Sequence, residues 1–194
     1  IVGSYYGEMI KDLTSRNHIR EIPTEAATAK YTAWDLGISD STSIWVCETL
    51  GGEVRLLDYY ENHGQSLDHY LAYLDEKGYR DYTHILPHDV MTRELQTGKS
   101  RYEFLTEAGL NIDVAPKMSV EDGIQAVRKM LPNTWFNKDT TKFGLECLRN
   151  YRRVFNDKLN VYQEKALHDW SSHCADAFRY LAVGLDTSGN NTRS

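Results

Sequence analysis

Residues 30–37 read KYTAWDLG, a short β-prone run that places Asp35 just ahead of a glycine. Two further β-prone runs follow at 43–49 and 54–61. The turn LGGE at 50–53 joins them, and glycine there supplies the positive φ that a hairpin needs. Because the three runs lie close together in the sequence, we expect them to form an antiparallel meander.

The sequence after the meander alternates between helical and extended patterns. We expect helices at 66–77, 102–108 and 120–130, short strands at 83–86 and 111–115, and two last helices at 142–155 and 170–185. The resulting order is β-β-β-α-β-α-β-α, followed by further helices. Such an order predicts an α/β fold, with a mixed sheet of five or more strands and helices on both faces.

The composition is that of a globular domain. A chain of 194 residues can bury one substantial core, and no run approaches the roughly 20 apolar residues of a membrane span. The three cysteines are odd in number and widely spaced, which favours free thiols in a reducing compartment. The net charge of −6 argues against tight, independent, non-specific binding of nucleic acid.

Three aspartates occupy positions that an α/β sheet brings together. Asp35 ends the first strand, Asp89 follows the strand at 83–86, and Asp176 lies between two alanines near the start of the last helix. If the first and fourth strands are parallel neighbours, Asp35 and Asp89 lie at one edge, on strands about 4.8 Å apart. Taken singly, each of these residues is more commonly a turn or cap residue. Together they predict a metal site.

Carboxylate oxygens suit Mg²⁺ or Mn²⁺. Two such ions, about 4 Å apart, catalyse in-line phosphoryl transfer, since one activates water and the other stabilises the leaving oxygen. The sequence therefore predicts hydrolysis of a phosphodiester. Asp40 is an additional candidate ligand, with a loop-capping role as the alternative.

Positive charges are concentrated near the end of the chain. Four of them fall within or beside the helix expected at 142–155, namely Lys142, Arg149, Arg152 and Arg153. They form either a DNA-facing patch or an ordinary solvated helix face.

Four motifs resemble one protein family, the C-terminal nuclease domain of the large terminase subunit of tailed phages. They are GSYY at 3–6, WDLG with the following DST at 34–42, LPHD at 86–89 and HDWSSHCADAFRY at 168–180. The resemblance implies an RNase H-like (RuvC-like) fold and an Mg²⁺- or Mn²⁺-dependent endonuclease that cuts concatemeric double-stranded DNA by a two-metal mechanism during genome packaging. It also implies catalytic and metal-binding roles for Asp35, Asp89 and Asp176. Some members of the family carry Glu where this chain has Asp89.

The resemblance implies a division of the chain into three parts. Residues 1–28 would be a linker helix from a preceding ATPase domain, residues 29–186 the nuclease domain, and residues 187–194 a disordered tail. The implied partners are double-stranded DNA, the ATPase domain of the same polypeptide, the portal ring and the small terminase subunit, in the host cytoplasm and without a membrane. The ATP-binding pattern GxxxxGK[ST] does not occur in this sequence.

Two other functions remain open from the sequence. One is a Holliday-junction resolvase-like nuclease of the same fold, and the other is a non-catalytic domain that docks DNA or a portal. A domain without metals has no need for three mutually repelling aspartates, which disfavours the second alternative. Two bound divalent ions would reduce the net charge to about −2, so the charge does not exclude DNA as the substrate.

Overall fold

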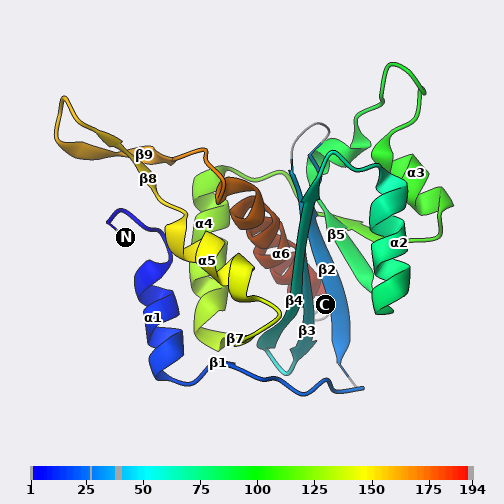
Figure 1. The fold of residues 1–194 in the computed structure, drawn as a ribbon. Coiled ribbons are helices and arrows are strands. Elements are labelled where there is room, and N and C mark those ends of the chain that lie inside the picture. The colour runs from blue at the N-terminus through cyan, green and yellow to red at the C-terminus, as the bar shows by residue number, and fades with distance from the viewer. Residues whose placement is uncertain (1, 27, 38–40, 192–194) are drawn as a thin grey trace.

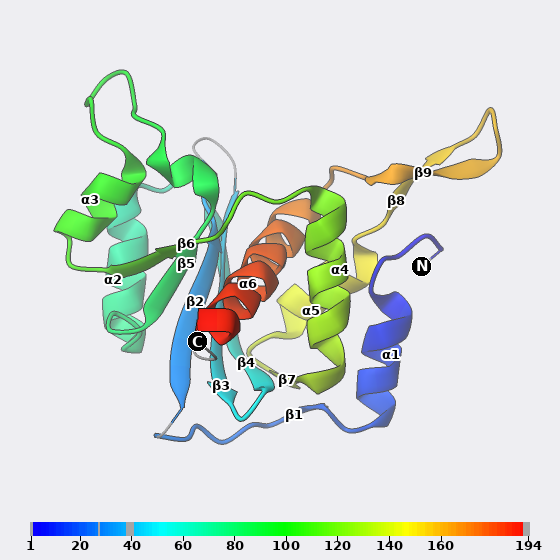
Figure 2. The ribbon, with the colours of Figure 1, turned by 180° about the vertical axis from the view of Figure 1, so that it is seen from behind.

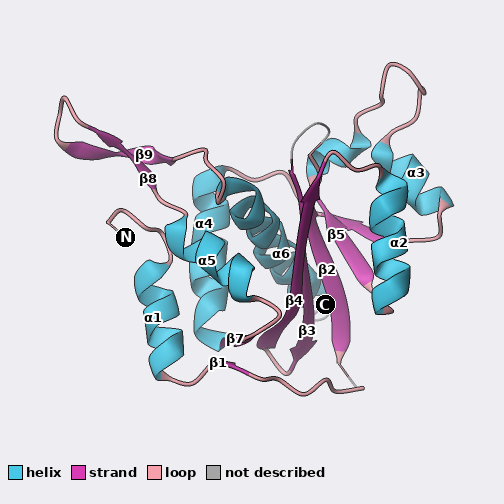
Figure 3. Ribbon diagram, viewed as in Figure 1, coloured by secondary structure: helices cyan, strands magenta, loops and turns pink. Residues whose placement is uncertain are grey.

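The computed structural model describes residues 2–26, 28–37 and 41–191, which form a mixed sheet with helices packed on both faces (Figures 1 and 3). The order of the seven strands is β1-β7-β4-β3-β2-β5-β6. The predicted mixed α/β fold is therefore confirmed. The strands are β1 (Ile19–Arg20), β2 (Ala29–Asp35), β3 (Ser41–Leu50), β4 (Glu53–His63), β5 (Thr83–Leu86), β6 (Asn111–Val114) and β7 (Thr134–Asn137).

The predicted meander and the predicted parallel pair are both present. Strand β3 pairs antiparallel with β2 and with β4. Strand β5 pairs with β2 in the parallel direction, with Thr32 opposite His84 and Ala33 opposite Ile85. The carboxyl ends of β2 and β5 consequently lie at the same edge of the sheet.

Two apolar cores cover the two faces of the sheet. Helices α1 (Gly7–Ser15), α4 (Val120–Met130), α5 (Lys142–Asn150) and α6 (Ser172–Asn191) pack on one face. The other face is covered by α2 (Leu67–Lys77), the 3₁₀ helix η1 (His88–Met91) and α3 (Arg101–Glu107). A further 3₁₀ helix, η2 (Leu131–Asn133), connects α4 to β7. Among the described helices, none is long and apolar enough to cross a membrane.

Helix α6 runs diagonally across the first face, as Figure 2 shows from behind. Its first turns are fixed by Trp45 of β3, whose indole Nε1–H donates a hydrogen bond of 3.0 Å to the carbonyl oxygen of Cys174. The Trp45 ring also contacts α5 at Gly144, where any added Cβ would clash with the ring. Further along α6, a Cβ on Gly184 would lie 2.9 Å from Ile85 of β5. The small residues therefore let α5 and α6 approach their neighbours closely.

The structure corrects the sequence prediction for residues 142–155. Helix α5 ends at Asn150, and the chain then forms a hairpin of β8 (Arg153–Asn156) and β9 (Val161–Ala166), which projects from the body in Figure 1. The continuous helix was predicted wrongly because the apolar spacing of α5 continues into Tyr151, Val154 and Phe155, residue types that favour strands. Helix α6 also continues through residues 187–191, which belong to the segment expected to be a disordered tail.

A buried chain of polar groups links β2 to β5. The indole of Trp34 donates to the hydroxyl of Thr32 at 2.7 Å, and that hydroxyl lies 2.6 Å from Nδ1 of His84. Nε2 of His84 lies 2.9 Å from the carbonyl oxygen of Arg80, so Nε2 carries the proton and Nδ1 accepts from Thr32. This arrangement is satisfied by a neutral imidazole, and burial lowers the pKa of His84.

The free energy of unfolding should therefore fall as the pH drops below about 6.5, the usual His pKa. In that range the unfolded chain binds a proton at His84, whereas the folded protein binds it more weakly because the pKa of His84 is lowered. We expect His84→Gln to lose less unfolding free energy between pH 7.5 and pH 5 than the wild type, as measured by urea denaturation. His63→Gln, at an exposed histidine, is the control. An equal loss in His84→Gln and wild type would contradict the prediction.

Candidate metal centre

Asp35 is the last residue of β2, and its side chain lies on the face covered by α6. Its backbone is in register with Ser43 of β3, and its side chain is only 17% exposed. Nδ1–H of His173 on α6 donates a hydrogen bond of 3.1 Å to Oδ2 of Asp35. Strand β2 and helix α6 thus meet through a direct side-chain contact at this carboxylate.

Asp89 lies in η1, directly after β5. Pro87 adopts the extended conformation, its carbonyl oxygen accepts a hydrogen bond from the amide of Val90, and the buried Val90 side chain anchors the turn. This anchor leaves Asp89 at the surface, with its side chain 66% exposed. The guanidinium of Arg101 lies 3.8 Å from Oδ2 of Asp89.

Asp176 lies just over one turn into α6, between the fully buried Ala175 and Ala177. Its side chain is 25% exposed. Nη2 of Arg179, three residues further along the helix, donates to Oδ1 of Asp176 at 2.7 Å. Each of the three carboxylates therefore has a cationic or hydrogen-bonding partner of its own.

The three aspartates lie close enough together to influence the same groups. Burial raises the pKa of Asp35, and the negative charges of Asp176 and Asp89 raise it further, against the hydrogen bond from His173. Burial and the charges of the same three aspartates raise the pKa of Tyr180 to about 12. The structure thus brings Asp35, Asp89 and Asp176 together at one edge of the sheet.

The donor set fits hard divalent cations in its chemistry, because its ligands are carboxylate oxygens. In the part of the chain that the structure describes, no three His, Cys, Asp or Glu side chains are close enough to enclose one ion. Mg²⁺ does not require such a cage, because it keeps several waters and is commonly bound by one or two carboxylates and by substrate phosphates. Asp35 and Asp176, each partly buried beside α6, could supply the one or two carboxylates that this pattern needs.

A fourth carboxylate, Glu61 of β4, lies along the same sheet edge. Ser43 of β3 pairs with Asp35 on one side and with Glu61 on the other, so the three side chains share a face. The hydroxyl of Tyr59 donates to Glu61 at 2.9 Å and lies 3.1 Å from the hydroxyl of Ser43. The register of the meander could have identified Glu61 from the sequence.

The four predicted DNA-binding residues do not share one helix. Lys142 and Arg149 lie on α5, where Arg149 pairs with Glu146, whereas Arg152 and Arg153 follow the helix. Arg152 lies 3.8 Å from Asp169, and the Arg153 guanidinium lies 5.4 Å from the centre of the Tyr5 ring. The expected helical spacing of these residues was wrong. Asp40, the additional candidate ligand, lies outside the described residues.

Sequence reasoning missed three partners of the carboxylates. His173 and Arg179 lie three residues before and after Asp176, and this spacing places side chains on the same side of a helix. That signal was available in the sequence. Arg101 carried no such signal, because it reaches Asp89 and the carbonyl oxygen of Leu36 only after the segment 92–100 folds back.

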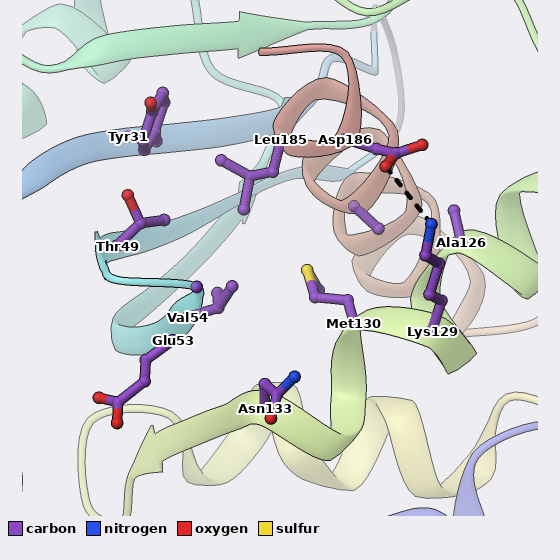
Figure 4. A pocket seen from close by; sticks show the side chains of 12 residues that line it. Tyr31, Thr49, Glu53, Val54, Ala126, Lys129, Met130, Asn133, Leu185 and Asp186 are labelled. Carbon is purple, nitrogen blue, oxygen red and sulfur yellow. Dashed lines mark ion pairs between the residues drawn. The ribbon is translucent and has the colours of Figure 1, made fainter. Parts of the chain in front are cut away.

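A cavity of about 460 Å³ lies at the opposite end of the strands, between β2, the β3–β4 turn, α4 and α6 (Figure 4). Apolar side chains such as Val54 and Met130 line it, and Lys129 and Asp186 form an ion pair of 3.9 Å at its margin. The cavity is remote from the three aspartates.

The fold is that of large terminase nuclease domains. The large terminase of a thermophilic bacteriophage in complex with ATP-γ-S matches with a TM-score of 0.68 and 17% identity, over 90% of this chain and 44% of that one. The large terminase nuclease from the thermophilic phage G20c with bound magnesium matches with a TM-score of 0.63 and 15% identity, over 94% of this chain and 97% of that one. The nuclease domain from bacteriophage SPP1 with bound Mn matches with a TM-score of 0.60 and 17% identity, over 84% and 92%.

No protein-family description and no curated protein sequence matches this chain. The predicted resemblance to terminase nuclease domains and the predicted RNase H-like fold are confirmed by the three-dimensional similarity. The chain spans less than half of the length of the large terminase that was solved with ATP-γ-S.

Replacing Asp35 with Asn should stabilise the metal-free protein. The neutral side chain removes both the cost of burying a charge and the repulsion from Asp176 and Asp89. We expect the melting temperature at pH 7.5 in EDTA to rise by a few degrees. This is the change expected when an unfavourable buried charge is removed. Asp75→Asn, at an exposed aspartate, should change it little. A fall in the melting temperature of Asp35→Asn would contradict this account.

Proposed function

We propose that this chain is a divalent-metal-dependent DNA endonuclease, the nuclease part of a phage large terminase. One observation carries the proposal. Asp35, Asp89 and Asp176 come from β2, η1 and α6 and lie at one edge of an RNase H-like sheet, where they influence the ionisation of the same groups. The fold shared with terminase nuclease domains supports the same conclusion.

The three aspartates would hold two Mg²⁺ or Mn²⁺ ions, with Asp40 as a further candidate ligand. The bound magnesium of the G20c nuclease and the bound Mn of the SPP1 nuclease support this choice of cations. Bound cations at this position would lower the pKa of an attacking water and stabilise the leaving oxygen of the phosphodiester. Oxygen ligands of this kind suit both metals.

The protein's own residues orient the carboxylates for this chemistry. His173 holds Oδ2 of Asp35 by a hydrogen bond. Arg101 of α3 lies 3.8 Å from Oδ2 of Asp89 in η1 and donates to the carbonyl oxygen of Leu36, just after β2, at 2.9 Å, so it joins η1 to the end of β2. The low exposure of Asp35 keeps bulk water away from one side of the site. These contacts fix the strand ends before any substrate binds.

Double-stranded DNA would lie across the sheet edge that bears the aspartates. The β8–β9 hairpin and the segment 92–100 project on either side of that edge (Figure 1). Both carry positive side chains, including Arg153 and Lys158 in the hairpin region and Lys99 in the segment. A duplex lying between these two projections would present its backbone to Asp35.

The whole protein would contain more than this chain. Because the large terminase solved in complex with ATP-γ-S is matched by this chain over only 44% of its length, we propose an ATPase domain in the same polypeptide. The portal ring and the small terminase subunit would be further partners, and the complex would act in the host cytoplasm.

Purified protein should nick or linearise plasmid DNA with Mn²⁺ or Mg²⁺, and EDTA should stop the reaction. Asp35→Asn, Asp89→Asn and Asp176→Asn should each lower the cleavage rate by about 100-fold or more, because each removes a proposed metal ligand. Asp75→Asn is the matched control for loss of a carboxylate elsewhere. Wild-type cleavage by Asp35→Asn would refute the metal assignment.

The same assay separates the alternative functions. A terminase nuclease should cut linear duplex at least as well as a four-way junction, whereas marked preference for the junction would identify a resolvase. DNA binding without cleavage in either metal would identify a docking domain.

Charge reversal should test the basic residues in their observed positions. Lys142 and Arg153 are exposed, whereas Arg149 and Arg152 already pair with carboxylates. In an Asp35→Asn background, Lys142→Glu with Arg153→Glu should weaken duplex binding and reduce the salt slope by about one for each lost phosphate contact. Lys77→Glu on α2 is the control. An unchanged slope would remove Lys142 and Arg153 from the DNA-binding surface.

A further inference from the structure

Arg179 is a buried cation beside the proposed metal ligand Asp176. Its side chain is 9% exposed, and its Nη2 binds Oδ1 of Asp176 at 2.7 Å. Asp176 keeps a second carboxylate oxygen, Oδ2, outside this contact. A rigid guanidinium that holds one oxygen fixes the direction in which the other oxygen points.

Helix α4 fixes the stem of Arg179. A Cβ added to Gly123 would lie 2.8 Å from Cδ and 3.1 Å from Cγ of Arg179. Because side chains do not tolerate such contacts, only glycine lets α4 lie against the arginine at this distance. The position of Arg179 is therefore set by packing as well as by its charge.

Hydrogen bonding does not fully compensate the burial of the Arg179 guanidinium. Its Nε is buried and has no hydrogen-bond partner among the described residues. Tyr151 lies near Arg179: burial and the charge of Asp176 raise the pKa of Tyr151, while the charge of Arg179 and a hydrogen bond from it oppose the rise. Arg179 thus packs against Gly123, lies near Tyr151 and binds Asp176 at 2.7 Å.

We propose that Arg179 is a positioning residue for the metal site, holding the Asp176 carboxylate in the orientation that binds a divalent cation, with Gly123 as its support. The proposal rests on the proposed function, because it takes Asp176 to be a metal ligand. Charge and positioning predict opposite results when Arg179 is removed. Loss of a nearby positive charge favours binding of a cation, whereas loss of orientation weakens it.

The test is calorimetric titration of Mn²⁺ into the EDTA-treated full chain, without DNA. We expect Arg179→Gln to lower the Mn²⁺ association constant by about 10-fold or more, as for other residues that orient metal ligands. Arg179→Lys should recover part of the affinity. Arg80→Gln is the matched control, since Arg80 binds Asp75 and the carbonyl oxygen of Ala108 on the other face of the sheet, and it should leave the affinity unchanged.

Gly123→Ala supplies a second test that changes no charge. The added methyl group must displace Arg179, so the Mn²⁺ affinity should fall in the same direction. In the Arg179→Gln background the same substitution should have little further effect, which is the coupling expected of residues that act through one contact. Thermal unfolding in EDTA shows whether each variant folds. If Arg179→Gln does not fold, the comparison of Gly123→Ala with wild type decides.

An unchanged or higher Mn²⁺ affinity in folded Arg179→Gln would overturn the proposal, as would wild-type affinity in Gly123→Ala. Asp176→Asn separates this failure from a failure of the proposed function. If Asp176→Asn abolishes Mn²⁺ binding and Arg179→Gln does not weaken it, only the positioning role is wrong. If Asp176→Asn leaves both Mn²⁺ binding and cleavage unchanged, the metal assignment itself is wrong.

Discussion

The indole of Trp45 joins the central sheet to the helix that carries Asp176. Its Nε1–H donates to the carbonyl oxygen of Cys174, and its ring contacts Phe178 on α6 at a centroid distance of 5.1 Å. A buried ring of this size contributes both apolar area and a fixed geometry. Because Cys174 lies two residues before Asp176, this contact sets the height and rotation of the first turns of α6 above Asp35. The proposed metal centre depends on that placement, since its third carboxylate is the one contributed by a helix and not by a strand end.

Like charges at one sheet edge would oppose folding unless the protein compensated them. Each carboxylate has its own partner: His173 for Asp35, Arg101 for Asp89 and Arg179 for Asp176. The compensation is incomplete for Asp35, whose pKa stays raised because burial and the other two charges outweigh the hydrogen bond. If the proposed cation binds beside such a carboxylate, its charge would offset part of the cost of assembling the site.

Local sequence signals predicted the parts of the fold that depend on short-range patterns. The alternation and turn of the meander, the end of β2 at Asp35 and the limits of α4 all follow from residues that are neighbours in the sequence. Strands β1 and β7 were missed because they are two and four residues long and exist only through pairing with distant strands. The role of Arg101 was missed for the same reason, since its contact with Leu36 at the end of β2 joins residues 65 positions apart. Strand pairing and the folding back of a loop onto the sheet are tertiary interactions, and a local sequence pattern does not encode them.

The N-terminal segment, expected as a linker helix, packs into the same core as α6. Tyr6 and Ile10 are almost fully buried there, and burial of large apolar side chains contributes roughly 1.5–3 kcal/mol each. The rings of Tyr6 and Tyr151 stack at a centroid distance of 5.9 Å. Since Tyr151 also lies beside Arg179, two residues, Tyr151 and Arg179, connect the segment to Asp176. Displacement of Tyr6 would therefore disturb the surroundings of the proposed metal centre, so the N-terminal segment has a physical connection to that site.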